Sequence, residues 1–177
     1  MSTKFDKASS EFVSGVEAHN SGEYQEAAEH FKKATELFEQ LREEEIEEAL
    51  QENIIGNLYQ ARSNYHKSIA DHLNFKMRDY ESALISYAKA IEDKKMAIKA
   101  AKELVKEKQI KDKEFPMELE TELYGLEAVR IECQAQIAIQ NKNLEKAAEY
   151  FKEAREKFLS KEKLHAALEN PYEEKLA

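Results

Sequence analysis

The chain has 177 residues, a net charge of −9 at pH 7, 36% charged residues, and only four glycines and two prolines. A chain this acidic is repelled by a phosphate backbone, which argues against nucleic acid as a partner. So few turn-forming residues exclude a fold built from many short strands. The length suits one domain, and the 42% of hydrophobic residues suffices for a core. We therefore predict an all-α fold of long amphipathic helices in a single domain spanning residues 1–177.

The first predicted hairpin covers residues 4–50. Its first helix runs over about residues 4–20, and its second begins near Glu23 and continues past Leu41. Residues 23–52 carry eleven Glu and three basic residues, a net charge of −8. Consecutive Glu side chains point around a helix instead of converging, so this stretch favours a solvated helix end over a divalent-metal site.

The second predicted hairpin covers residues 53–108 and follows a link near residues 51–56. Its first helix ends near Met77. The apolar side of its second helix includes Ala83, Tyr87 and Ile91, and the other face is rich in lysine. Residues 80–113 hold nine lysines and six acids, a net charge of +3.

The basic face of this fourth helix has two interpretations. We favour a structural role, in which it complements the acidic second helix or is simply solvated. The alternative is a docking face for an acidic partner. The residues that would form it are Lys95, Lys99, Lys102 and Lys106.

The third predicted hairpin covers residues 116–170. Residues 109–115 form the preceding loop, and Pro116 suits the first turn of a helix, where no amide partner is needed. The last helix begins near Leu144 and stops near Asn170, because the residue before Pro171 disfavours helix, leaving 171–177 as a tail. The single cysteine, Cys133, excludes an internal disulfide and fits a reducing compartment. It shares a helical face with apolar neighbours, which predicts a buried structural thiol.

Three stretches of the chain share one pattern. Each has an aromatic residue or leucine, then alanine three residues later, an aromatic four after that, and alanine three further on. These positions are Tyr24, Ala27, Phe31 and Ala34; Tyr80, Ala83, Tyr87 and Ala90; and Leu144, Ala147, Phe151 and Ala154. The spacing places each set on one stripe of a helix. Gly22, Asp79 and Asn143 precede the stripes, as helix-ending or helix-capping residues do. Each copy therefore predicts the elbow of an antiparallel helical hairpin.

This pattern resembles the tetratricopeptide repeat, whose second helix carries A-x3-F. No copy has that family's Trp or closing Pro. The copies are 56 and 64 residues apart, against about 34 in the family, which predicts longer helices. The resemblance implies three stacked antiparallel hairpins, about six helices, in a right-handed superhelix or bundle.

By the same resemblance, the first helix of each hairpin lines an inner groove that binds a peptide or helix. The resulting candidates are Phe12, Val16, His19, Tyr65, Ser68, His72, Phe75, Glu132, Gln136 and Ile139. Each of them could instead belong to the core. Some members of the family bind a peptide carboxylate with a lysine and asparagine clamp, but Phe12 and Val16 occupy the corresponding early positions here. A groove rich in Phe, Tyr and His favours an apolar or helical peptide.

Motifs for catalysis and for cofactors are missing from the sequence. It contains no HExxH, P-loop, GxGxxG or GxSxG. Glu162 and His165 have the spacing of a di-iron motif, but the required second copy is absent. We predict no enzyme, no metal and no cofactor. The first residues lack the apolar core of a secretory signal, and no apolar run approaches the roughly 20 residues that span a bilayer. These features predict a cytoplasmic protein without membrane insertion.

Two hypotheses for function follow. The first is a non-enzymatic adaptor or scaffold that binds a protein or peptide. A narrower version is a trafficking adaptor, because the Gly22-x-Tyr24-x-x-Ala27 elbow resembles that of three-helix microtubule-interacting and trafficking domains. The alternative is a structural subunit whose apolar faces close a homo-oligomer.

Overall fold

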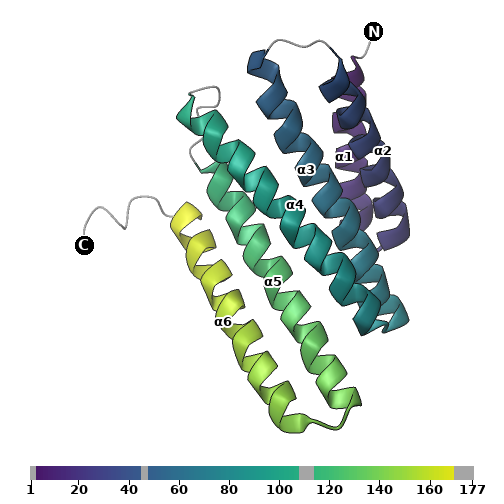
Figure 1. Ribbon diagram of the computed structural model, residues 1–177, viewed down its shortest axis with the longest axis vertical. Coiled ribbons are helices and arrows are strands. Elements are labelled where there is room, and N and C mark those ends of the chain that lie inside the picture. The colour runs from purple at the N-terminus through teal and green to yellow at the C-terminus, as the bar shows by residue number, and fades with distance from the viewer. Residues whose placement is uncertain (1–2, 45–47, 108–113, 170–177) are drawn as a thin grey trace, which may run out of the picture.

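Six α-helices in three antiparallel hairpins make up the structure, a computed structural model that describes residues 3–44, 48–107 and 114–169 (Figure 1). The all-α prediction is confirmed, since no strand occurs in these ranges. The helices are α1 (Lys4–Asn20), α2 (Tyr24–Glu43), α3 (Glu48–Asp71), its π-helical continuation η1 (His72–Met77), α4 (Tyr80–Lys106), α5 (Phe115–Gln140) and α6 (Leu144–Glu169).

The predicted hairpin boundaries need small corrections. The link near residues 51–56 is wrong, because those residues lie within α3. Pro116 stands in the first turn of α5 as predicted, although Phe115 already starts that helix. The tail 171–177 and most of the loop 109–115 lie outside the described residues.

The three elbows share one backbone conformation. Each elbow contains one left-handed residue within two residues of the end of its first helix, with φ of 79° at Gly22 and 57° at both Arg78 and Lys142. In the first elbow the Glu23 amide donates to the carbonyl of Ala18, which satisfies a helix-end carbonyl in the manner of a Schellman motif. These helices therefore end in a left-handed residue and a backbone hydrogen bond to the last turn, and that residue need not be glycine.

The helix that follows each of the last two elbows is capped as predicted. The Asp79 side chain accepts a hydrogen bond from the amide of Ser82 at 3.1 Å. The Asn143 side chain accepts one from the amide of Lys146, also at 3.1 Å. Both bonds satisfy amides that have no partner inside the helix.

The π-helix η1 adds one residue to the second hairpin. Its elbow bond runs from the Asp79 amide to Leu73, six residues back, where the other elbows span five. The extra residue keeps small side chains in register where paired helices meet. Buried Ala8 and Ala128 each lie 14 residues before the left-handed residue of the first and third hairpins. The corresponding buried residue of the second hairpin, Ser63, lies 15 residues before it.

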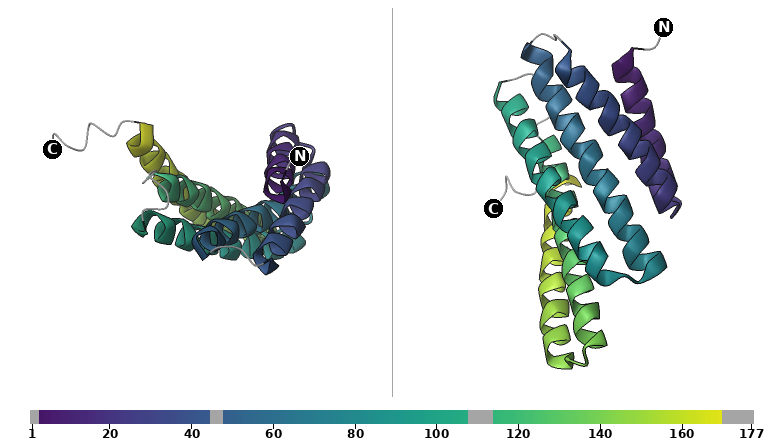
Figure 2. Two further views of the ribbon diagram at one scale, coloured as in Figure 1. Left: turned by 90° about the horizontal axis from the view of Figure 1, so that it is seen from above. Right: turned by 45° about the vertical axis from the view of Figure 1, so that its right-hand side comes forward.

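The helices lie in a curved row. Each packs mainly against the helices that precede and follow it in the chain, and α1 and α6 stand at opposite ends (Figures 1 and 2). One apolar cluster joins α1, α2 and α3 around Phe38 and Leu58. Another joins α3, α4 and α5 around Tyr87 and Leu126. The second helix of one hairpin is thus covered by the first helix of the next.

The contact between α1 and α2 leads to a first prediction. A Cβ atom at Gly15 would lie 2.8 Å from Cε1 of Phe31, whose buried ring also packs edge-on against Phe12 at 5.4 Å between centroids. We expect Gly15→Ala to lower the free energy of unfolding, because overpacking costs about 1–3 kcal/mol and exceeds the gain of roughly 0.5–1 kcal/mol in helix propensity.

The control for this prediction is Gly125→Ala in α5. A Cβ atom there meets its nearest neighbour, Nζ of Lys161, at 3.5 Å, an ordinary contact. We expect this variant to be more stable than the wild type by roughly 0.5–1 kcal/mol. Urea unfolding followed by circular dichroism measures both. Equal shifts in the same direction would show that the contact with Phe31 does not restrict Gly15.

Candidate functional site

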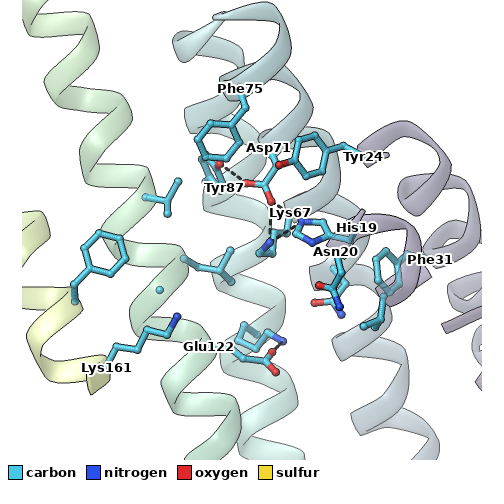
Figure 3. A pocket seen from close by; sticks show the side chains of 17 residues that line it. His19, Asn20, Tyr24, Phe31, Lys67, Asp71, Phe75, Tyr87, Glu122 and Lys161 are labelled. Carbon is cyan, nitrogen blue, oxygen red and sulfur yellow. Dashed lines mark hydrogen bonds and ion pairs between the residues drawn. The ribbon is translucent and has the colours of Figure 1, made fainter. Parts of the chain in front are cut away.

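A cavity of about 440 Å³ lies between the three hairpins (Figure 3). The first helix of every hairpin contributes to its wall, and so do side chains from α2, α4 and α6. The first-helix residues are Val16, His19 and Asn20 from α1; Asn64, Lys67, Asp71 and Phe75 from α3 and η1; and Glu122, Gly125, Leu126 and Val129 from α5. Because both ends of the curved row supply residues, the cavity lies inside the curve (Figure 2).

One side of the cavity is a buried polar cluster centred on Asp71 of α3. Asp71 as a whole residue is 4% exposed. It accepts hydrogen bonds from Lys67 Nζ at 2.8 Å and from the Tyr87 hydroxyl at 2.5 Å, and His19 Nε2 lies 2.7 Å from it. The cluster therefore ties α1, α3 and α4 together beside the cavity (Figure 3).

Opposing effects act on the acidity of this cluster. Burial alone would raise the pKa of Asp71, but the hydrogen bond from His19 and the charge and hydrogen bond of Lys67, together with the Tyr87 bond, hold the pKa below its ordinary value. Burial and the neighbouring Asp71 charge raise the pKa of Tyr87. Asp71 is thus a carboxylate and Tyr87 a neutral donor at pH 7.

The other side of the cavity combines apolar side chains with lysines. The Lys94 ammonium, whose side chain is 1% exposed, donates to Glu122 at 2.5 Å. Lys161 extends from α6 toward the cavity (Figure 3), with its ammonium 3.5 Å from where a Cβ atom of Gly125 would lie. It has no ion pair in the part of the chain that the structure describes. The lining holds Lys67, Lys94 and Lys161 against two carboxylates. Three cations against two anions give a net charge of +1 with histidine neutral.

The predicted groove residues do not all meet in this cavity. Val16, His19 and Phe75 line it. Tyr65 and His72 line a separate hollow between α2 and α3. The others lie elsewhere: Phe12 packs against the first apolar cluster, Ser68 is fully buried, and Glu132, Gln136 and the 40% exposed Ile139 are not in the lining.

The sequence interpretation missed Lys67, Asp71, Gly125 and Lys161 as cavity residues. A signal was available for the first two, because Lys67 and Asp71 are an i, i+4 charge pair beside the apolar stripe of a helix. No local signal marks Gly125 and Lys161, which meet only through the packing of α5 on α6.

The lysine face of α4 does not complement the acidic α2, which was one of its two predicted structural roles, because α3 lies between them (Figure 1). Lys102 pairs with Glu120 of α5 at 2.6 Å, and Lys106 pairs with Glu103 of its own helix at 3.3 Å. Lys95 and Lys99 are exposed and have no ion pair within residues 3–44, 48–107 and 114–169. The docking alternative for this face stays a prediction.

Cys133 is buried as predicted, with 1% exposure. Burial, with help from the charges of Glu132 and Asp71, raises the pKa of its thiol to about 12. At neutral pH the residue is therefore a protonated thiol and packs as an apolar group.

Comparisons with protein-family models, with curated proteins and with solved structures found no match for this chain. Among the described residues, no helix is long and apolar enough to cross a membrane, and no group of three or more His, Cys, Asp or Glu is arranged to hold a metal ion.

His66 in α3 makes stability depend on pH. Burial lowers its pKa below the ordinary 6.5, and Lys89 and Arg62 add to this against the opposing charge of Asp93. The unfolded chain therefore takes up a proton at a higher pH than the folded one. We expect stability to fall as pH drops below about 6.5 and this loss to end once folded His66 is protonated.

The measurement is the melting temperature from about pH 8 to about pH 5. His66→Gln should flatten the decline, because the substituted side chain does not titrate. The control is His165→Gln on α6, whose side chain is 62% exposed. If His66→Gln retained the full decline, other groups would be responsible.

Proposed function

We propose that this protein is a non-enzymatic, tetratricopeptide-repeat-like adaptor that holds a peptide or helix of a protein partner in the cavity between its hairpins. The observation that carries the proposal is that one cavity of about 440 Å³ is lined by the first helix of all three hairpins. A single ligand there would contact three separate elements, which suits recognition of an extended or helical segment.

The lining indicates the chemistry of the ligand. Phe31, Phe158 and Leu126 offer apolar surface, which suits a large apolar side chain. Lys161 faces the same space and has no ion pair with any residue that the structure describes, while Lys94 and Lys67 are paired. The proposed ligand is therefore an amphipathic peptide with an apolar anchor and an acidic residue placed to reach Lys161.

Selection from a random peptide display library tests the proposal. We expect the wild type to enrich peptides that have Asp or Glu close to a large apolar residue. Lys161→Glu should lose these peptides, because a carboxylate in the cavity repels their acid. Gly125→Leu should lose them as well, because its side chain fills the cavity. Both variants are first checked for a native melting temperature.

The matched control is Lys163→Glu, which is exposed on α6 two residues from Lys161 and about 200° around the helix. It should select the same peptides as the wild type. The proposal fails if no peptide is enriched, or if the same peptides bind when the cavity is filled.

The narrower proposal of a trafficking adaptor rests on the Gly22-x-Tyr24-x-x-Ala27 elbow alone. A cytoplasmic location is proposed because the chain has one cysteine and that cysteine is buried. Nucleic acid is not proposed as a partner, because the net charge is −9.

A further inference from the structure

The motif aromatic of the last helix is uncovered, whereas those of α2 and α4 are buried. The motif aromatic of α2, Phe31, is 2% exposed and that of α4, Tyr87, is fully buried. Phe31 packs against Gly15 and Phe12 of α1, and Tyr87 lies in an apolar cluster with Leu126 of α5. The equivalent Phe151 on α6 is 40% exposed and Leu144 is 69% exposed. In the structure α6 is the end of the row (Figure 1).

The uncovered residues form a continuous stripe along the helix, which we call the α6 stripe. Its members are three or four residues apart and all are exposed, so they share one side of the helix. They are Ala148, Phe151, Arg155, Leu159, Glu162 and Ala166. Exposed Phe151 and Leu159 on the same side of one helix indicate an interaction surface.

The charges on the α6 stripe are complementary to each other. Arg155 and Glu162 have no ion pair among the described residues. Seven residues apart on one helix, they are separated by about 10 Å along its axis and do not pair within one molecule. In an antiparallel second copy centred between Phe158 and Leu159, each Arg155 would lie opposite a Glu162, Leu159 would lie at the axis, and Phe151 would meet Ala166.

We propose that the α6 stripe binds the α6 stripe of a second copy of this chain, antiparallel and about a two-fold axis near Leu159. Two symmetric ion pairs then set the register of the two copies. This surface is separate from the cavity, so the proposal does not depend on peptide binding.

Stacking of α1 from another copy on the α6 stripe is a poorer fit. In α5, the residues that pack on or near α4 include Leu126 and Val129. The equivalent positions of α1, counted from the left-handed residue of each elbow, are Asp6 and Ser9. Such stacking would place polar groups against Phe151 and generate an open chain of molecules, whereas the two-fold contact closes as a dimer.

Sedimentation equilibrium over a wide range of protein concentration tests the proposal. The wild type should dimerise reversibly. Arg155→Glu and Glu162→Arg should each weaken the dimer at least about tenfold, because each variant creates two like-charge contacts. The double variant Arg155→Glu with Glu162→Arg should return the dissociation constant to near the wild-type value, because both pairs are restored in reverse.

The control is Glu153→Arg, which is exposed on α6 two residues from Arg155 and about 200° around the helix. It should dimerise like the wild type. A wild type that stays monomeric at every concentration overturns the proposal. So does a dimer that the single charge reversals leave unchanged, or one that the double variant fails to restore.

Discussion

Replacing Asp71 with alanine should lower the free energy of unfolding by about 3 kcal/mol, the lower end of the range for removing one partner of a buried ion pair. The change leaves the ammonium of Lys67 without its anion and the buried hydroxyl of Tyr87 without its acceptor. The Lys67 side chain is 33% exposed and can recover some hydration, which keeps the loss from being larger. The cluster also joins α1 to α3 through His19, so the change should weaken the packing of the first hairpin on the second as well.

Urea unfolding measures this loss, with Tyr87→Phe as a graded comparison. Tyr87→Phe removes one donor and leaves the charges paired, so we expect a loss of about 0.5–1.5 kcal/mol. Glu17→Ala is the control, since Glu17 is exposed on α1. If Asp71→Ala were no less stable than Tyr87→Phe, the ion pair between Lys67 and Asp71 would contribute nothing to the free energy of unfolding.

The second large effect concerns two phenylalanines at the same position of the repeated motif. Phe31→Ala should lower the free energy of unfolding by about 3–5 kcal/mol, because it removes a buried ring and leaves a cavity. Phe151→Ala should cost less than about 1 kcal/mol, because its ring is 40% exposed and water replaces it. Both are measured by urea unfolding at a protein concentration low enough to keep the chain monomeric.

Phe31→Leu is the control for the first variant, since it retains most of the apolar volume and should recover part of the stability. Equal losses for the two alanine variants would contradict the assignment of α6 as an uncovered end helix. A neutral Phe31→Ala would show that the ring does not hold α1 against α2.

The sequence determined the helices and the elbows between them, although not the start of α3, because elbows and caps depend on residues that are close along the chain. Asp79 and Asn143 were recognisable as caps from their side chains alone, since each accepts from an amide three residues ahead. The spacing of the motif placed its alanines on one stripe of each helix, and Ala27 and Ala83 on that stripe have no exposed surface.

Only the tertiary structure decided which faces of these helices meet. Tyr65 and Val129 both stand 13 residues before a left-handed residue, so counting along the chain assigns them equivalent positions in their hairpins. The extra residue in η1 turns α3 by about 100° relative to that count, and Asn64 lines the cavity in place of Tyr65. Counting along the chain does not reveal such a shift, because helical periodicity is unchanged on either side of it.

Tertiary packing also decided which residues the lysines of α4 pair with and how exposed the α6 stripe is. The acidic α2 and basic α4 appear complementary by composition, yet the partner of Lys102 is Glu120 of α5, since that is the helix that packs beside it. Phe31 and Phe151 have the same local motif, yet Phe31 is 2% and Phe151 40% exposed, because burial depends on the side chains that packing brings to each ring, such as Phe12 of α1 at Phe31. Short-range chemistry therefore determined the hairpins, and long-range packing decided the cavity and the exposed surface.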